Sequence, residues 1–401
     1  MQTNLHPSLA DHPDAPVVES ILRSCVHCGF CNATCPTYQA LGDERDGPRG
    51  RIYLMKQFFE TGEVTAATRT HLDRCLTCRN CETTCPSGVQ YGKLADVGRY
   101  LIEQKTERSI TEKLVRTALL NVLPYPERFG FFLRVGQAFR PVMPSALKQK
   151  TPPKQTAMPW PTNSTNTRKM LVLRGCAQAA ATPNTNAAAA NVFAKLGIDL
   201  VEAPEAGCCG AANYHLQDHD GGIDKMKANI DAWWPYIEAG AEAIVMTASG
   251  CGAMVQDYGH VLRNDNDYAE KAAKVSTLCR DISDVLLDED LSTIKADKAG
   301  KIAVHCPCTL QHAMKQGGKV EAILQTLGFE TVTGKDPHLC CGSAGTYSVL
   351  QPKLAKQLGQ QKVANLTAHA PDTIVTSNIG CQLHLGSLSS TPVKHWIELL
   401  V

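Results

Sequence analysis

Two short cysteine runs constrain this chain more than any other feature of its sequence. One run occupies residues 25–36 and the other residues 75–86, and both read C-x-x-C-x-x-C-x-x-x-C-P. Bacterial ferredoxins hold iron–sulfur clusters with this spacing, and in two-cluster ferredoxins the fourth cysteine of each run ligates the cluster of the other run. Two identical runs, 75 − 25 = 50 residues apart, therefore predict a pair of [4Fe–4S] clusters.

The crosswise rule predicts which cysteines hold which cluster. The first cluster is assigned Cys25, Cys28, Cys31 and Cys85, and the second Cys75, Cys78, Cys81 and Cys35. Three thiolates, each separated from the next by two intervening residues, lie on one tight turn and can bind three corners of a cube. The fourth cysteine, which precedes a proline, leaves that turn. A structural zinc ion is the alternative, but zinc sites usually combine two separated C-x-x-C pairs.

Composition narrows the class of protein further. The net charge of +1 does not favour nucleic-acid binding. Eighteen cysteines in 401 residues are many, yet secreted disulfide scaffolds are usually short, and residues 1–18 contain no apolar signal segment. Reduced thiols that bind metal in the cytoplasm fit better. No apolar stretch is long enough to span a bilayer, so we expect no transmembrane segment.

The N-terminal third is expected to be mostly helical. Residues 48–59 place Ile52, Met55 and Phe59 on one helical face, and residues 93–113 also have a helical pattern. We therefore predict a helical, two-cluster ferredoxin-like domain over residues 1–140. A linker is predicted over residues 141–168, which are rich in Pro, Thr, Asn, Ser and Lys.

Residues 114–140 contain an apolar stretch with few acidic residues. One interpretation is that this stretch packs against the second domain. The other is that it contacts a membrane surface or a partner subunit. The sequence leaves both open.

The remainder of the chain contains an internal repeat of strands and helices. Predicted strands run into cysteines at residues 170–176 and 243–251, and the same order recurs at 302–308 and 374–381. The landmarks are displaced by a nearly constant interval, for example 308 − 176 = 132 and 381 − 251 = 130. We predict two α/β modules with parallel sheets, residues 169–300 and 301–401, which makes the whole chain a mixed α+β and α/β protein.

Each module carries a second cysteine constellation: one cysteine, a Cys-Cys-Gly group, and one more cysteine. The members are Cys176, Cys208, Cys209 and Cys251 in the first module and Cys308, Cys340, Cys341 and Cys381 in the second. Because sites gather at the carboxyl ends of parallel strands, these residues are a candidate third site for a cluster, a metal or a redox thiol. The alternative is that they are small buried apolar residues.

Other residues near these groups have an open role. His305, His312 and His384 are either ligands or structural histidines. Cys279 and Cys306 have no counterpart in the repeat and are expected to be ordinary thiols.

Two common cofactor motifs are missing. No G-x-G-x-x-G follows a predicted strand, and no G-x-x-x-x-G-K-[ST] occurs. We therefore expect no catalytic residue and no hydride-accepting cofactor in this chain. Oxidation of an organic substrate would need another subunit, from which the clusters receive electrons one at a time.

Several stretches carry a family resemblance, namely residues 21–38, 42–52, 71–89, 306–312 and 395–400. They resemble iron–sulfur subunits of bacterial glycolate oxidases, in a wider family with twin cysteine-rich "CCG" domains. The resemblance implies that a flavin-containing subunit oxidises glycolate to glyoxylate. This chain would then pass electrons towards a quinone at the inner face of the cell membrane.

One departure from the wider family concerns the candidate third site. In heterodisulfide reductase relatives the CCG domain ends in C-x-x-C and can hold an unusual [4Fe–4S] cluster. Here Met254 and His384 stand where that last cysteine would be, which argues against a third cluster.

The sequence leaves three rival functions open. One is the equivalent subunit for lactate or glycerol 3-phosphate. Another is a thiol/disulfide reductase acting through Cys208–Cys209 and Cys340–Cys341. The third is an assembly or anchoring subunit with structural clusters. The partner subunit, and not this chain, would hold the substrate.

Overall fold

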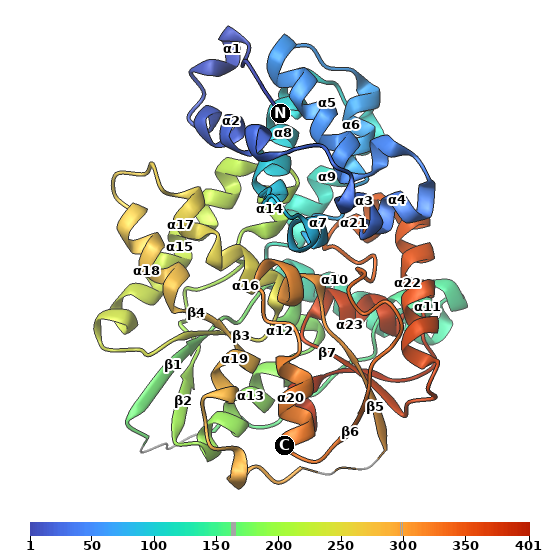
Figure 1. Cartoon of the computed structure of the whole chain (residues 1–401). Helices are drawn as coiled ribbons and strands as arrows, with labels where there is room; N and C mark the ends of the chain where they lie inside the picture. The colour runs from blue at the N-terminus through green and yellow to red at the C-terminus, as the bar shows by residue number, and fades with distance from the viewer. Residues whose placement is uncertain (162–165, 297, 299) are drawn as a thin grey trace. The chain divides into compact units, whose positions relative to one another are not determined.

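The computed structural model describes residues 1–161, 166–296, 298 and 300–401 (Figure 1). Its contacts divide the chain into two compact units. One unit comprises Met1–Arg116 and His338–Leu358, and the other Thr117–Pro337 and Gly359–Val401. The predicted linker and first module include positions outside the described residues (162–165, 297 and 299), and the predicted domain boundaries stay predictions.

Residues 1–116 contain helices and no strand. The helices that begin in the first unit are α1 (Pro7–Ala10), α2 (Ala15–Ser24), α3 (Phe30–Ala33), α4 (Pro36–Leu41), η1 (Glu44–Asp46), α5 (Pro48–Thr61), α6 (Ala66–Asp73), α7 (Asn80–Thr84), α8 (Tyr91–Lys105), α9 (Ile110–Val122), α21 (Tyr347–Leu350) and α22 (Pro352–Thr367). The expected helical character of the N-terminal region is therefore confirmed.

The predicted apolar face of residues 48–59 forms the core of this unit. Ile52, Met55 and Phe59 on α5 are all buried, as is Phe58 beside them. Helix α8 approaches α5 closely, because a Cβ on Gly98 would lie 2.6 Å from the sulfur of Met55. The helical pattern at residues 93–113 is in fact two helices, since α8 ends at Lys105 and α9 begins at Ile110.

The described residues of the second unit form two parallel sheets, as predicted, and each sheet has four strands. Their orders are β2-β1-β3-β4 and β6-β5-β7-β8, so the second sheet repeats the topology of the first. The strands are β1 (Arg168–Val172), β2 (Ile198–Val201), β3 (Ile244–Met246), β4 (Cys279–Asp281), β5 (Lys301–His305), β6 (Glu330–Val332), β7 (Thr373–Thr376) and β8 (Val393–His395). The predicted duplication of an α/β module is confirmed.

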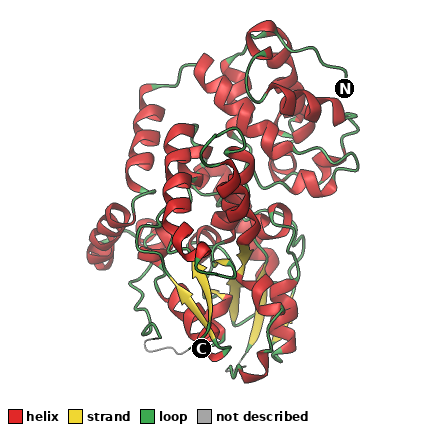
Figure 2. Ribbon diagram, turned by 90° about the vertical axis from the view of Figure 1, so that its left-hand side faces the viewer, coloured by secondary structure: helices red, strands yellow, loops and turns green. Residues whose placement is uncertain are grey.

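Helices flank the strands of both sheets (Figure 2). Those that begin in the second unit are α10 (Pro126–Phe139), η2 (Arg140–Val142), α11 (Ser145–Lys150), α12 (Ala177–Ala181), α13 (Asn184–Lys195), α14 (Ala211–His215), α15 (His219–Glu238), α16 (Ser249–Gln256), α17 (Tyr258–Val261), α18 (Ala269–Leu278), α19 (Ile282–Leu287), η3 (Leu291–Thr293), η4 (Thr309–Ala313), α20 (Lys319–Thr326), α23 (Ile379–Gly386) and η5 (Trp396–Leu399). No helix among the described residues combines the length and apolar character needed to cross a bilayer.

The two sheets share one hydrophobic core. Val172 and Phe193 of the first module and Val304, Ile323 and Trp396 of the second belong to the same buried cluster. Each α/β module therefore completes the core of the other, and the modules are expected to unfold together. This shared core holds β1, β3, β5 and β7 in place. Four cysteines of the second constellation, Cys176, Cys251, Cys308 and Cys381, follow the carboxyl ends of these strands.

The buried carboxyl group of Asp281 gives this unit a testable pH dependence. Asp281 is fully buried at the end of β4, and its Oδ1 accepts hydrogen bonds from the backbone N–H of Ser283 (2.9 Å) and from Ser283 Oγ (2.6 Å). Its Oδ2 has no hydrogen-bond partner in the described part of the chain. Burial raises the pKa of Asp281 to about 6, although the two bonds from Ser283 oppose the shift.

We expect Asp281→Asn to raise the free energy of unfolding at pH 7.5 by about 1–2 kcal/mol, because the neutral amide avoids a buried charge. In the wild type the stabilising contribution of the protonated carboxyl is complete below about pH 4 and is lost as the pH rises to about 6. Urea unfolding at several pH values measures both effects. Asp281→Ala is the control, because it also removes the acceptor that caps α19. Equal pH slopes for wild type and Asp281→Asn between pH 4 and 6 would contradict this account.

Candidate iron–sulfur centres

The first predicted ligand set lines a single hollow in the first unit. About 420 Å³ of space there is not filled by protein atoms, and its walls include Cys25, Cys28, Cys31 and Cys85. The pKa of Cys31 is raised to about 11, by burial first and then by the neighbouring thiols Cys25, Cys85 and Cys28 in that order. Three cysteines of the first run and the last cysteine of the second run are therefore neighbours.

The second predicted ligand set lines a second hollow, of about 310 Å³, in the same unit. Its walls include Cys35, Cys75, Cys78 and Cys81. The pKa of Cys81 is raised well above its usual value by burial first, and then by Cys78 and Cys75, with a smaller effect of Cys35. Cys81 and Tyr91 line both hollows, so the two sites share a wall.

The two runs have matching backbone geometry. In the first run His27 (φ 59°) and Gly29 (φ 86°) are left-handed, and in the second run Thr77 (φ 52°) and Arg79 (φ 58°) occupy the same two positions. Left-handed backbone is uncommon for residues other than glycine and is concentrated at functional sites. Both runs therefore curl in the same way around their first three cysteines.

Eight thiols in two groups of four fit the donor set of two [4Fe–4S] clusters, because such clusters are held by four thiolates each. Around each hollow lie three cysteines of one run and the fourth cysteine of the other, and Cys81 lies in the wall shared by both. This is the donor arrangement of a two-cluster ferredoxin. The described residues lining the two hollows include no aspartate or glutamate.

A buried arginine lies beside the second hollow. Arg51 is only 1% exposed and donates hydrogen bonds from Nε to the backbone oxygen of His71 (2.7 Å) and from Nη1 to Thr37 Oγ1 (3.0 Å). Thr37 Oγ1 is in turn 3.2 Å from the sulfur of Cys35. Arg51 therefore brings a positive charge and a hydrogen-bonded link to the ligands of the second hollow.

The fully buried carboxylate of Asp46 gathers three basic residues. Its oxygens lie 3.0 Å from His71 Nδ1, 2.8 Å from Arg74 Nη1 and 3.5 Å from Arg51 Nη2. Asp43, Asp46 and His71 could together hold a metal ion. However, Arg51 and Arg74 already supply positive charge to Asp46, so a cation is not required there.

Positive charge also favours the thiolate form of Cys75. Burial alone would raise the pKa of Cys75, but the guanidinium groups of Arg51 and Arg99 outweigh it and lower the pKa. Arg99 is held in place by hydrogen bonds to the backbone oxygens of Leu72 (2.6 Å) and Cys75 (2.7 Å). A thiolate is the form of cysteine that binds metal.

Residues His338–Leu358, which include the second Cys-Cys-Gly group, belong to the same unit as both hollows. Asn80 Nδ2 donates to the backbone oxygen of His338 (3.1 Å), and the hydroxyl of Tyr347 donates to the backbone oxygen of Arg74 (3.0 Å). Burial raises the pKa of Tyr347, and the next largest contribution comes from Cys75. The Tyr347 ring thus lies beside the peptide that carries the first cysteine of the second run.

Tyr347→Ala is expected to raise the midpoint potential of the second cluster by tens of millivolts, because water admitted near Cys75 stabilises the more negative, reduced cluster. Tyr347→Phe keeps the ring and should stay close to wild type. The measurement is a redox titration followed by electron paramagnetic resonance, and the signal of the first cluster is the internal reference. Identical potentials in all three proteins would show that Tyr347 does not shield this site.

The four cysteines of the first module lie in a row. Side-chain hydrogen bonds link Cys176 to Cys208, Cys208 to Cys209, and Cys209 to Cys251. The interaction with Cys176 lowers the pKa of Cys208, but Cys209 and burial outweigh it and raise that pKa to about 12. The neighbouring thiols and burial also raise the pKa values of Cys176 and Cys209, so Cys176, Cys208 and Cys209 are protonated at neutral pH in the absence of a metal.

Two buried polar residues hold the Cys-Cys-Gly loop of the first module. Asn229 Nδ2 donates to the backbone oxygen of Cys208 (2.9 Å), and the hydroxyl of Tyr258 donates to that of Cys209 (2.8 Å). Gly210 has φ 86°, and a Cβ there would lie 2.8 Å from the backbone oxygen of Gly222. Glycine is therefore required after the cysteine pair by both conformation and space.

The second module repeats this loop geometry only in part. Gly342 has φ 87°, and a Cβ there would lie 2.7 Å from the backbone oxygen of Ala355. Cys340 and Cys341 are both buried, and they belong to the first unit together with Gly342. Cys308, which is partly exposed, precedes η4 in the second unit.

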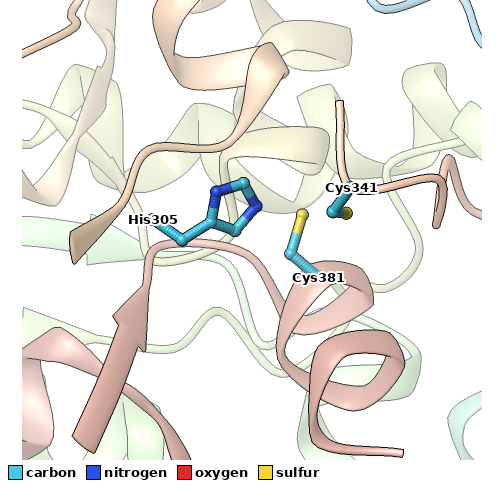
Figure 3. Close-up of side chains that lie close together, drawn as sticks. All are labelled: His305, Cys341 and Cys381. Carbon is cyan, nitrogen blue, oxygen red and sulfur yellow. The ribbon is translucent and has the colours of Figure 1, made fainter. Parts of the chain in front are cut away.

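A histidine and a cysteine of the second module face one another. A ring nitrogen of His305, at the end of β5, and the sulfur of Cys381, in α23, lie within 4.8 Å (Figure 3). Figure 3 also labels Cys341, a residue of the first unit. Both ring nitrogens of His305 lack a hydrogen-bond partner among the described residues, and burial, followed by the charge of Lys362, lowers its pKa well below the usual value. His305 is therefore neutral, the form that binds metals.

The sequence did not reveal several residues around these sites, among them Arg51, Tyr347, Asn229 and Tyr258. Arg51 gave one usable signal, because it precedes Met55 by four residues and so lies on the apolar face of α5. A charged residue in a buried stripe indicates a buried ion pair. The other three residues are joined to the cysteine loops by long-range contacts that leave no local pattern.

Comparison with known families defines the class of this protein. Residues 21–89 match the family described as a 4Fe-4S dicluster domain, and residues 170–256 and 302–386 each match the family described as a cysteine-rich domain (CCG). The chain is thus an iron–sulfur protein with a dicluster domain and two cysteine-rich domains.

The relatives specify the family. The chain is 53% identical over 403 residues to the glycolate oxidase iron-sulfur subunit of Escherichia coli, covering 100% of this chain and 98% of that protein. It is 29% identical to the probable glycolate oxidase iron-sulfur subunit of Bacillus subtilis, covering 92% of this chain and 89% of that one. The chain therefore belongs to the family of glycolate oxidase iron–sulfur subunits, as its sequence motifs indicated.

More distant similarities are narrower. The lactate utilization protein A of Geobacillus thermodenitrificans is 28% identical over 212 residues, which are 51% of this chain and 84% of that protein. The crystal structure of a hypothetical protein from Helicobacter pylori has a TM-score of 0.53 at 11% identity, covering 97% of this chain and 72% of that chain. The latter similarity concerns the fold alone.

Proposed function

We propose that this chain transfers electrons through two [4Fe–4S] clusters, as a subunit of a complex that oxidises glycolate to glyoxylate. The observation that supports this most is the pair of hollows: the walls of each include three cysteines of one run and the fourth cysteine of the other, and Cys81 lies in the wall that the two hollows share. The proposed ligands are Cys25, Cys28, Cys31 and Cys85 for one cluster and Cys75, Cys78, Cys81 and Cys35 for the other. The family of the chain supports glycolate as the substrate of the complex.

The proposed direction of electron flow is from a flavin-containing partner subunit to a quinone. Clusters of this kind accept and release one electron at a time, which connects a two-electron oxidation to a separate acceptor. We place the complex in the cytoplasm, at the inner face of the cell membrane, because quinones are dissolved in the bilayer.

The residues of this chain would act on the clusters by position and charge. The cysteine thiolates hold them, and Arg51 and Arg99 offset part of the negative charge near Cys75. Such charges, hydrogen bonds and solvent exposure set cluster potentials. The row of thiols in the first module, Cys176, Cys208, Cys209 and Cys251, is proposed as a further metal or redox site.

The first experiment measures iron and acid-labile sulfide after anaerobic reconstitution of the purified chain. About eight irons per chain are expected for two clusters, and a larger number would support a further site. Near-absence of iron and sulfide would rule out the electron-transfer function. Bound zinc in place of iron would do the same.

The second experiment tests the substrate and acceptor. The complex is purified from cells by means of this chain, and its glycolate-dependent reduction of a quinone analogue is measured. The same activity is then measured in a preparation of the partner subunits that lacks this chain. Loss of quinone reduction without the chain is expected, while the flavin subunit alone can still reduce a dye. Unchanged quinone reduction in its absence would contradict the proposal.

A second candidate substrate is lactate, favoured by the similarity to a lactate utilization protein. Testing both substrates on the same purified complex decides between them, because the partner subunit, and not this chain, is proposed to bind the substrate. Faster reduction of the quinone analogue with lactate than with glycolate would replace glycolate in the proposal.

A further inference from the structure

Residues 125–154 of the second unit expose an unusual number of large apolar side chains. The exposed fractions are 56% for Phe131, 57% for Phe132, 60% for Phe139 and 80% for Val142. They lie on α10 and η2 (Figure 1), and Leu147 on α11 adds another at 55%. We refer to the exposed apolar and basic side chains of residues 125–154 as the α10–α11 surface. Of the stretch 114–140, α10 packs against α12, whereas Phe131, Phe132 and Phe139 remain exposed.

The exposed side chains lie on the face of α10 opposite its packed side. Gly130 is the one buried residue of α10, and a Cβ there would lie 3.4 Å from the Cβ of Ala180 on α12. Residues 131, 135 and 139 recur at intervals of four, so they share one face of α10. Gly130 lies on the other face, and α10 thus rests on the module through a small residue and leaves its aromatic side uncovered.

The segment after α10 is held against the helix. Gln137 Nε2 donates to the backbone oxygen of Pro152 (3.2 Å), and Arg140 Nε donates to that of Thr151 (2.9 Å). Residues 151 and 152 directly follow α11, so these bonds keep α11 and its lysines close to the end of α10. The apolar and basic side chains therefore form one surface.

The charge of this surface is strongly one-sided. Residues 125–154 contain six basic residues and one acidic residue, 6 − 1 = +5, whereas the whole chain carries +1. The basic residues are Arg128, Arg134, Arg140, Lys148, Lys150 and Lys154, and the acidic one is Glu127. All of these except Arg140 are exposed. The rest of the chain therefore has a net charge of −4 (1 − 5), and the positive charge is concentrated beside the phenylalanines.

We propose that the α10–α11 surface docks the protein on an anionic lipid bilayer. The phenylalanines would enter the boundary between headgroups and acyl chains, and the lysines and arginines would contact lipid phosphates. An amphipathic helix with aromatic and cationic residues binds membrane surfaces in this way. This inference rests on the proposed function, because it names the part of the chain that would bring the clusters to a membrane-dissolved quinone.

The composition of the surface favours lipid over a protein partner. Lysine is depleted in protein–protein interfaces, and charged residues are excluded from their cores. Here three exposed lysines, Lys148, Lys150 and Lys154, lie 9 to 15 residues after Phe139 (148 − 139 and 154 − 139). A surface with a single acidic residue is complementary to a uniformly anionic layer.

Vesicle sedimentation of the full, cluster-containing chain tests the proposal. Vesicles of neutral phosphatidylcholine are compared with vesicles that also contain anionic phosphatidylglycerol, at low and at high salt. We expect binding to the anionic vesicles to be about tenfold tighter or more, and to weaken at high salt.

Two sets of variants separate the apolar and electrostatic contributions. Phe131→Ser, Phe132→Ser and Phe139→Ser combined should weaken binding to anionic vesicles about tenfold or more. Lys148→Gln, Lys150→Gln and Lys154→Gln combined should weaken it at low salt and reduce its salt dependence. Leu287→Ser is the matched control, since Leu287 is 42% exposed in the same unit but lies outside the surface.

The outcomes distinguish this proposal from the proposed function, because iron content and cluster absorbance are measured in the same samples. Full cluster content with no vesicle binding, or with equal binding by all variants, overturns the lipid surface alone. The proposal is also overturned if the serine variants bind vesicles normally but no longer co-purify with a flavin-containing subunit. That result would make the α10–α11 surface a protein interface.

Discussion

Replacing Cys35 and Cys78 together is expected to remove one cluster and leave the other intact, so that about four of about eight irons remain. The two residues belong to different runs, 43 positions apart (78 − 35), yet they line the same hollow. The surviving signal should be that of the first cluster, whose proposed ligands are all unchanged. A cube that loses two of its four thiolates cannot be held.

The matched variant replaces Cys35 and Cys28, which lie in the same run. Under crosswise ligation each cluster loses one ligand, because Cys28 lines the first hollow and Cys35 the second. Both electron paramagnetic resonance signals should then change, and neither cluster should remain as in the wild type. Iron analysis, sulfide analysis and the spectrum of the reduced protein give the three readouts.

The two double variants exchange their results if each run holds its own cluster. Cys35 and Cys28 would then share one cube, and their joint loss would leave the other cube unchanged, whereas the Cys35 and Cys78 variant would damage both. Cys279→Ala is the control for a buried cysteine outside both hollows, and it should keep all of the iron. The experiment thus tests the ligand assignment independently of any activity.

Local patterns in the sequence were sufficient to predict part of this fold, but not the strands β4, β6 and β8. The strand predicted at the start of each module is present as β1 and β5, because a short apolar run bounded by glycine or cysteine is typical of a buried strand. The cysteine spacing predicted the two ligand groups because a run of twelve residues encodes its own turn.

Long-range contacts could not be predicted in this way. The hydroxyl of Tyr347 and the backbone of Arg74 are 273 residues apart in sequence, and no spacing relates them. The break between α8 and α9 was missed because Arg108, at the break, forms buried ion pairs with Asp73 (2.8 Å) and Glu103 (2.6 Å) that the helical pattern does not show. The apolar character of residues 114–140, which include α10, was evident from the sequence. The sequence does not show which apolar side chains pack against the rest of the protein and which are exposed.

Arg51→Met is expected to destabilise the first unit by about 3–5 kcal/mol, because removing one member of a buried ion pair leaves the other charge without full compensation. Asp46, its partner at 3.5 Å, is completely buried. His71 and Arg74 still contact Asp46, so the lower end of this range applies if they take over the charge of Arg51. Urea unfolding of the cluster-containing protein measures the change.

The same substitution should lower the midpoint potential of the second cluster by tens of millivolts. Reduction adds negative charge to the cluster, and a nearby cation stabilises the reduced form, so the loss of that cation makes reduction harder. Burial alone would lower the pKa of Arg51, but Cys75, Tyr91 and other neighbours raise it, so Arg51 carries its charge at every pH of interest. The potential of the first cluster is the reference within the same sample.

Two controls separate charge from hydrogen bonding at this position. Arg51→Lys keeps the positive charge, but its ammonium group cannot contact His71, Thr37 and Asp46 together as the guanidinium group does. The midpoint potential of this variant should therefore be closer to the wild-type value than its free energy of unfolding is. Arg45→Met removes an exposed arginine paired with Asp43 and should change neither quantity. If Arg51→Met also left both unchanged, the buried charge would have no part in holding or tuning the second cluster. A loss of stability with an unchanged potential would restrict Arg51 to a structural role. If the charge of Arg51 acted on the cluster, its removal would shift the potential in any variant that still folds, because this electrostatic effect requires no contact.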